Sequence, residues 1–259
     1  MTLTLSLIRR EITGRYRGSA LGVVWSLLTP LLMLAVYTLV FGVVLKSRWD
    51  IPGREGAAHS TAEFAVILFC GLIVFQYFSE VVTAAPGLVL ANVNYVKKIV
   101  FPVHILPVVS AGAALFHAAV SMLVLLVFAA VVFGGLPSTV LLLPVAFAPL
   151  VVMGLGLTWI LAALGVYFRD IGQLIGPLVT ASMFLSPVLF QRSAMPEWLQ
   201  PALLLNPLTI PVESVRAVTL FGQAPDWTAL GLYSLAAIAV AFAGEAFFQA
   251  TRRGFADVL

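Results

Sequence analysis

Charged residues are scarce in this chain. Asp, Glu, Lys and Arg make up 10% of its 259 residues, whereas hydrophobic residues make up 61%. An average soluble protein has about 25% charged residues, and the mean hydropathy here is +1.08. This composition excludes an ordinary soluble fold. It predicts a polytopic membrane protein whose spans leave no length for a folded soluble domain.

Motifs for catalysis and nucleotide binding are also missing. The sequence has no G-x-x-x-x-G-K-[ST] loop for nucleotide phosphates, and no G-x-S-x-G, H-E-x-x-H or paired-carboxylate arrangement. Its single cysteine, Cys70, lies in an apolar segment, so neither an intramolecular disulfide nor a cysteine metal site can form. We therefore expect a protein that is not an enzyme and holds no metal. The net charge of +3 is expected to set membrane topology and not to bind nucleic acid.

Long apolar runs fill most of the sequence. The first, 23–45, would form a helix about 34 Å long at ~1.5 Å per residue, enough to cross a hydrocarbon core of about 30 Å. Turn signals such as Gly134-Gly135-Leu136-Pro137 separate later runs. The predicted fold is an all-α integral membrane protein, with one domain over 1–259 and six spans at 23–45, 64–82, 103–133, 139–166, 171–190 and 227–248.

The stretch 191–226 is apolar but cannot cross the membrane as one helix. Pro196, Pro201, Pro207 and Pro211 cut it into short pieces. Such pieces can enter the membrane only as short helices that are protected from lipid by protein. We expect re-entrant helices here, between spans five and six.

Residues 1–22 combine basic and apolar side chains ahead of the first span. Two interpretations are open: an amphipathic helix that lies at the interface, with a linker after it, or a basic flank that fixes topology. An apolar stripe with helical spacing supports the helix and consists of Met1, Leu5, Ile8, Ile12 and Tyr16. Leu3 and Leu7 lie off this stripe.

The distribution of positive charge predicts the orientation. Six spans place both termini on one side, and nine of the 14 Lys and Arg residues then fall on the N-terminal side of the membrane. Because Lys and Arg are enriched in cytoplasmic segments, both termini are predicted to be cytoplasmic.

Few ionisable residues fall within the spans. His117 lies in the middle of the third, where a neutral imidazole hydrogen-bonded to a neighbouring helix is favoured over a proton relay. Glu80 and Glu245 lie near span ends, and this sparse set argues against a proton-coupled carrier. Aromatic residues belong either to interfacial belts or to a channel that stacks on sugars; the candidates for a channel are Trp25, Tyr37, Phe41, Phe75, Tyr77 and Phe184.

Several ordered motifs point to one family. They are RREITGRYRGSALGVVWSLLTPLLMLAVYTLVFG, NVNYVKKIVFPVHILP, YFRDI, the segment Asn206-Pro207-Leu208 and the tail RRGFADVL. Together they cover essentially the whole chain, which resembles the permease subunits of ABC-2 type exporters of polysaccharides such as O-antigen, capsule and wall teichoic acid. One departure is that Val103-His104 follows Phe101-Pro102, where relatives often carry a charged pair.

The resemblance implies a homodimer in the bacterial cytoplasmic (inner) membrane that works with two separate ABC ATPase subunits. The partner ATPases would bind ATP and Mg, so this chain needs no cofactor, and the implied substrate is a lipid-linked glycan. It also implies three functional regions: a substrate entrance or gate at Arg9, Arg10, Arg15, Tyr16 and Arg17; ATPase coupling at Asn92, Asn94, Lys97, Lys98, Arg169 and Asp170; and an external gate at Asn206 and Pro207.

Other functions compete with this interpretation. Within the same family, an exporter of a drug or small lipid is the nearest alternative. A secondary carrier driven by an ion gradient is disfavoured by the lack of carboxylates deep in the membrane. A membrane-embedded transferase would need clustered Asp, Glu or His with a metal, which Asp170 and Glu80 alone do not supply.

Overall fold

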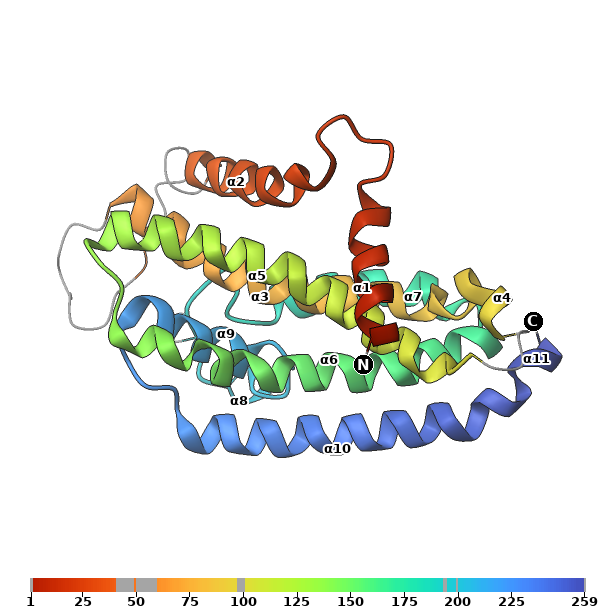
Figure 1. Cartoon of the computed structure of the whole chain (residues 1–259). Helices are drawn as coiled ribbons and strands as arrows, with labels where there is room; N and C mark the ends of the chain where they lie inside the picture. The colour runs from red at the N-terminus through yellow and green to blue at the C-terminus, as the bar shows by residue number, and fades with distance from the viewer. Residues whose placement is uncertain are drawn as a thin grey trace.

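The computed structural model describes residues 2–40, 49, 60–96, 101–192, 195–198 and 200–258, and these contain helices but no strand. Long helices run side by side in a bundle, α2 lies along one edge of it, and α1 crosses the bundle direction (Figure 1). The main helices are α1 (Thr2–Arg15), α2 (Trp25–Tyr37), α3 (Thr61–Leu88), α5 (Leu106–Phe133), α6 (Leu143–Tyr167) and α10 (Trp227–Thr251).

Five helical stretches are long and apolar enough to cross a membrane, and they match the first, second, third, fourth and sixth predicted spans. The second begins earlier than predicted because Ser60 caps α3 ahead of the apolar run, and it also continues past 82 to Leu88. Ser60 Oγ accepts from the Glu63 amide at 3.1 Å, and Glu63 Oε2 accepts from the Ser60 amide at 2.9 Å. The five stretches are Gly22–Val40, Thr61–Leu88, Val103–Phe133, Ser138–Tyr167 and Trp227–Gly254.

The fifth predicted span is shorter than expected. α7 (Ile171–Phe184) has 14 residues, about 21 Å at ~1.5 Å per residue, which does not cover the hydrocarbon core alone. It ends ahead of Ser186-Pro187, since the residue before a proline avoids the helical conformation. Six complete spans therefore stay a prediction.

Short helices follow α7 through the proline-rich stretch. They are α8 (Gln200–Leu203), α9 (Thr209–Arg216) and the π-helical η7 (Ala217–Phe221). In Figure 1, α7 begins at the end of the bundle where α6 stops, and α10 begins at the opposite end. Residues 171–226 together therefore carry the chain back along the bundle in pieces.

α3 is the central helix and is buried along most of its length, with Ile67, Val74 and Val81 fully enclosed. Two close glycine contacts join α6 to α3 and α10 to α6. A Cβ on Gly165 of α6 would clash with the Pro86 carbonyl of α3, and a Cβ on Gly244 of α10 would clash with the Gly156 carbonyl of α6. Small residues let main chains approach in this way, so α3, α6 and α10 form one tightly packed unit.

The predicted N-terminal helix is present as α1 and packs across α5. Ile8 fits over Gly112, where a Cβ would lie 2.6 Å from Ile8 Cδ1. Leu5 of the predicted stripe is exposed, whereas Leu7, which lies off the stripe, is buried. The buried line is therefore set by the crossing with α5 and only partly by the sequence stripe.

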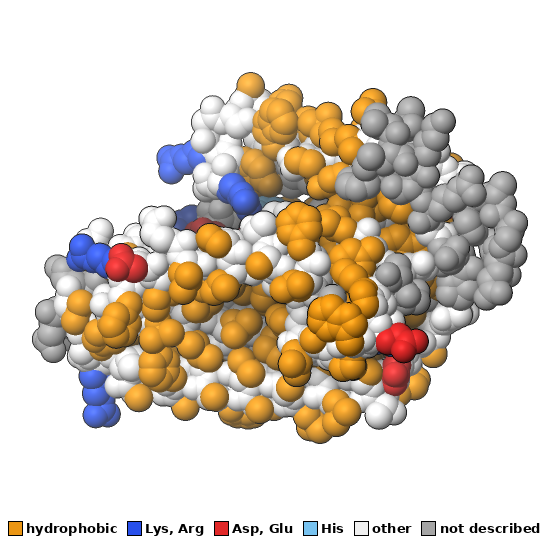
Figure 2. All heavy atoms as spheres, turned by 180° about the vertical axis from the view of Figure 1, so that it is seen from behind, with side chains coloured by type: hydrophobic (Ala, Val, Ile, Leu, Met, Phe, Trp, Pro, Cys, Tyr) orange, Lys and Arg blue, Asp and Glu red, His pale blue; other side chains and the backbone are white. Residues whose placement is uncertain are grey.

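The surface separates charge from apolar area. On the face shown in Figure 2, hydrophobic side chains cover the flank, and Lys and Arg side chains lie near α1 and at the end that carries the C-terminus. At that end the Tyr167 hydroxyl donates to the Thr251 carbonyl at 2.8 Å, which joins the ends of α6 and α10. Exposed Arg169, Arg252 and Arg253 follow these two ends.

Candidate functional site

Two neighbouring cavities lie between the N-terminal segment and the bundle. The first, of about 360 Å³, is enclosed by α2, α3 and α5, with Arg15 and Tyr16 at its edge. The second, of about 530 Å³, lies beneath the end of α1. Four residues line both cavities and therefore mark their junction: Arg15, Gln76, Glu80 and His117.

An ion cluster occupies this junction. Arg15 Nη1 forms an ion pair with Glu80 Oε1, and His117 Nδ1 lies 2.9 Å from the same carboxylate oxygen. His117 Nδ1 is also 2.9 Å from Arg15 Nη1. The ring nitrogen can donate to Glu80 or accept from Arg15, but it cannot do both at once. Glu80 is thus partly enclosed with a permanent cation beside it.

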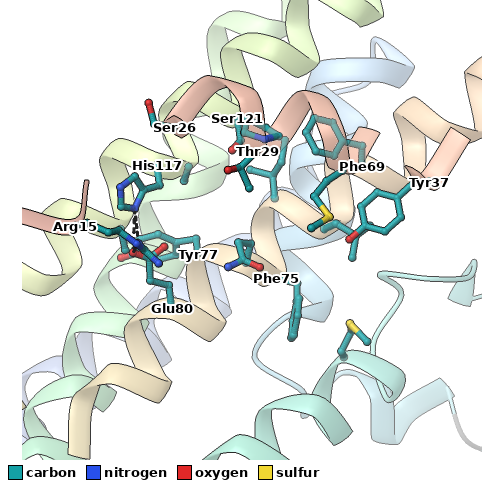
Figure 3. Close-up of a pocket in the computed structure, with 18 of the residues that line it drawn as sticks. Arg15, Ser26, Thr29, Tyr37, Phe69, Phe75, Tyr77, Glu80, His117 and Ser121 are labelled. Carbon is teal, nitrogen blue, oxygen red and sulfur yellow. Dashed lines mark hydrogen bonds and ion pairs between the residues drawn. The ribbon is translucent and has the colours of Figure 1, made fainter. Parts of the chain in front are cut away.

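Three separate helices bring these side chains together. Arg15 is the last residue of α1, Glu80 lies near the end of α3, and His117 lies on α5 facing it (Figure 3). The edge of the Tyr16 ring packs against His117, with ring centroids 6.0 Å apart. Burial raises the pKa of the Tyr16 hydroxyl, which therefore stays neutral.

Aromatic side chains gather at the other end of the first cavity. Tyr37 of α2 and Phe69 and Phe75 of α3 lie at this end, whereas Tyr77 also lines the cavity but lies beside Glu80 (Figure 3). Thr29 and Ser121 lie between this aromatic end and the ion cluster, and Ser26 lies near His117. The cavity is therefore charged at one end and aromatic at the other.

The predicted channel aromatics are divided by the structure. Tyr37, Phe75 and Tyr77 line the first cavity, whereas Trp25 and Phe184 line neither cavity. Phe184 lies at the end of α7 with 56% of its side chain exposed. Phe41 is outside the described residues. A channel role for any of them stays a prediction.

The predicted gate residues lie on α1 and the turn after it. Arg9, Arg10 and Arg17 are exposed, while Arg15 and Tyr16 reach the cavity. Gly18 and Gly22 have positive φ values of 87° and 51° and turn the chain from α1 into α2. Of the five predicted gate residues, Arg15 and Tyr16 thus line a cavity, and the other three line neither cavity.

The predicted coupling residues that are described lie at one end of the bundle. Asn94 is exposed on α4 (Val93–Val96), and Arg169 and Asp170 are exposed in the turn between α6 and α7. Both segments lie at the end that carries the C-terminus (Figure 1). Asn92 Nδ2 donates to the Leu88 carbonyl at 2.9 Å and so helps to end α3. Lys97 and Lys98 are outside the described residues.

The predicted external-gate residues bind neighbouring segments. Asn206 Nδ2 donates to the carbonyls of Ser182 and Leu185 at 2.8 and 2.9 Å, so it holds the end of α7. The hydroxyl of Tyr233 on α10 donates to the Pro207 carbonyl at 2.9 Å. These bonds tie the turn before α9 to α7 and α10.

Arg216, at the end of α9, is a buried arginine close to the predicted external gate. Arg216 Nε donates to the Ile67 carbonyl at 3.1 Å, Nη2 donates to the Val188 carbonyl at 2.6 Å, and Nη1 donates to the Pro187 carbonyl. The Trp49 ring covers the guanidinium, with its centroid 4.4 Å from Cζ. Within the described residues Arg216 has no ion pair, so main-chain oxygens and a ring face hold the charge.

In the sequence, Glu80 and His117 stand apart from each other, and no local pattern joins them to Arg15. The expected contact of His117 with a neighbouring helix is confirmed. Arg216 belongs to no motif in the sequence, and its position in an apolar, proline-cut stretch is the one signal there of its burial. Among the described residues, no group of three or more His, Cys, Asp or Glu side chains is placed to hold a metal ion.

Comparison with known proteins supplies the family. Residues 2–220 match the model of the ABC-2 type transporter family. The chain is 31% identical over 258 residues to the O-antigen export system permease protein RfbA of Myxococcus xanthus, a match that covers 98% of this chain and 94% of that protein.

Two further relatives match over most of their length. The chain is 25% identical over 259 residues to the permease RfbA of Klebsiella pneumoniae, covering 99% of this chain and 95% of that protein. It is also 25% identical over 249 residues to the polysialic acid transport protein KpsM of Escherichia coli, covering 94% of this chain and 91% of that protein. The five apolar helices and these matches agree, and the chain belongs to the ABC-2 type transporter family.

Proposed function

We propose that this chain is the membrane-spanning subunit of an ATP-driven exporter that moves lipid-linked polysaccharide across the bacterial inner membrane. The observation that carries the proposal is the match over almost the entire chain to relatives named for O-antigen export and polysialic acid transport. The cavity supports it, because its charged end suits an acidic lipid head group and its aromatic end offers ring faces to sugars.

ATP hydrolysis is assigned to a separate ABC ATPase partner that binds ATP and Mg. The sequence lacks a phosphate-binding loop of its own. The partner would bind the end that carries α4, Arg169, Asp170 and the C-terminus, which we place in the cytoplasm together with the N-terminus. Two permease chains and two ATPase subunits would form the working unit.

Transport in this proposal follows from two states of the membrane subunit. ATP binding in the partner favours one state through the docked segments, because a ligand shifts such an equilibrium only by binding the two states with different affinity. The glycan lipid enters beside α1 and leaves past the short helices of the 191–226 region. These helices are the proposed external gate, with Asn206 and Pro207 at its turn.

A deletion experiment tests the proposal. Cells that lack the chain should lose surface polysaccharide and accumulate lipid-linked glycan inside, and the wild-type gene should reverse both changes. Accumulation of a drug or a small lipid with normal surface polysaccharide would favour the alternative exporter. Co-purification of a P-loop ATPase with vanadate-sensitive hydrolysis is expected as well, whereas transport driven by an ion gradient without ATPase would contradict the proposal.

A further inference from the structure

The carboxylate of Glu80 occupies the position of an anion at the junction of the two cavities. A single oxygen, Oε1, is contacted by Arg15 Nη1 and lies 2.9 Å from His117 Nδ1. Arginine and imidazole nitrogens that converge on one oxygen are the donors that also bind phosphate. The protein thus supplies its own anion to a site that is open on both sides.

We propose that Arg15 and His117 bind the diphosphate group of the transported lipid, and that Glu80 is an internal counter-ion that this group displaces. The assignment of the diphosphate to a lipid rests on the proposed function. The contacts at the site themselves recognise only the diphosphate and not the lipid chain. Entry into the cavity is then an exchange of one anion for another at Arg15.

The geometry favours such an exchange. Among the described residues, the polar contacts of Arg15 involve only Nη1, and its side chain is 51% exposed, so its remaining donors can reach a ligand. A diphosphate carries more charge than a carboxylate and offers several oxygens, so it can accept from both Nη atoms of the planar guanidinium. The cavities on either side, of about 360 and 530 Å³, provide the volume.

Other polar groups fix where the ligand would lie. Ser79, Thr83 and Ser110 line the second cavity, and the Thr83 hydroxyl donates to the Ser79 carbonyl at 2.6 Å. Glu11 also lines this cavity and would repel an anion there. A diphosphate is therefore expected at the junction itself, between Arg15 and His117, with the hydroxyl groups on one side.

Displacement of Glu80 also changes what holds α1. The Arg15–Glu80 ion pair ties the end of α1 to α3, while Ile8 over Gly112 ties its middle to α5. When the ligand takes Arg15, the tie to α3 is lost and the apolar tie to α5 remains. Substrate binding would thus loosen only the end of α1 that leads into α2.

The test is a double-mutant cycle on binding. The chain, purified with its co-purifying ATPase in lipid nanodiscs, is titrated with radiolabelled farnesyl diphosphate. Glu80→Gln should bind about tenfold more tightly than wild type, since the competing charge is gone, and Arg15→Gln about tenfold more weakly. In the double variant most of the gain from Glu80→Gln should disappear, because Arg15 is the cation for which Glu80 competes, and only its competition for His117 is left.

Controls separate this effect from others. Glu245→Gln removes the same charge from α10, away from both cavities, and should leave the affinity unchanged. Farnesyl monophosphate should bind more weakly than the diphosphate. Inorganic pyrophosphate should compete weakly if the lipid contributes, whereas competition as strong as that of farnesyl diphosphate would overturn the assignment to a lipid.

Other outcomes overturn the proposal. Unchanged or weaker binding by Glu80→Gln would make Glu80 a structural tie, and an equal gain from Glu245→Gln would reduce the effect to net charge. If Glu80→Gln fails to fold, the half-exposed Arg15→Gln decides the matter, and wild-type affinity in that variant rejects the site. Either result leaves polysaccharide export intact as the function, because that is judged by surface glycan in the deletion strain.

Discussion

Arg15 and Arg216 hold their charges in opposite ways. Arg15 is 51% exposed and is paired with a carboxylate at the junction of two cavities. Arg216 is 3% exposed and is held by three main-chain carbonyls under the Trp49 ring. A carboxylate partner can be exchanged for another anion, whereas main-chain carbonyls of packed segments cannot move away. The difference agrees with the binding role proposed for Arg15, and it gives Arg216 a structural role.

The largest effect is expected from Arg216→Met. The three carbonyls would lose their donors in a buried site, which should destabilise the protein by about 3 kcal/mol or more. Thermal unfolding in detergent, followed by size-exclusion profiles, measures this. The control is Arg192→Met, because Arg192 pairs with Glu213 at 3.3 Å while more than a third exposed, and its loss should cost less than about 1 kcal/mol. Equal melting temperatures for the two variants would contradict a structural role for Arg216.

Gly71→Ala should perturb the same site from the side of α3. Its Cβ would clash with Arg216 Nη2 and lie 3.1 Å from the Val188 carbonyl oxygen. We expect a loss of about 1–3 kcal/mol from overpacking. The matched control is Gly87→Ala in the same helix, where nothing lies within 4 Å of the new Cβ. Similar melting temperatures for the two variants would contradict the close approach.

Arg15→Gln should separate stability from function. Arg15 is half exposed, and Glu80 keeps His117 as a partner at 2.9 Å when Arg15 is removed. The loss of a partly exposed pair of this kind costs roughly 0–1 kcal/mol, so the melting temperature should remain close to that of wild type. Surface polysaccharide should nevertheless fall several-fold in cells that contain this variant at normal membrane levels. Full export with unchanged stability would show that Arg15 has no part in substrate entry.

Salt should give the smallest effect. The stability difference between wild type and Arg15→Gln should shrink between about 0.05 and 0.5 M NaCl, since salt screens exposed charges. The difference between wild type and Arg216→Met should not change, because that guanidinium is shielded from solvent. Two differences with the same salt dependence would mean that the two arginines are not distinguished by their surroundings.

Much of the fold was predictable because hydropathy and turn residues are local properties. Five apolar runs became long helices, and the re-entrant prediction rested on prolines that do divide the stretch after α7. The fifth span failed in length because α7 ends ahead of Ser186-Pro187, within an apolar run that hydropathy alone reads as continuous. Burial was not predictable either: the α2 and α3 spans have mean hydropathies of 2.1 and 2.0, yet 11% and 72% of them are buried.

The candidate site was predictable only in parts. Arg15 and Tyr16 were assigned to the entrance, but Glu80 is 65 residues from Arg15 and 37 from His117 in sequence. No local pattern brings such distant side chains together; packing of α1 and α3 against α5 does. Arg216 and Arg192 look alike as loop cations in the sequence, and only the carbonyls of residues 67, 187 and 188 set them apart.

The contact of Gly156 with Gly244 has a mechanical consequence. Because no side chain separates the two main chains, α10 cannot slide by a helical turn along α6 without placing larger residues at the crossing. The contact of Gly165 with Pro86 restrains α6 on α3 in the same way. We therefore expect these three helices to move as one unit, and we expect any rearrangement during transport on the opposite flank, where α1 and α2 have few buried residues.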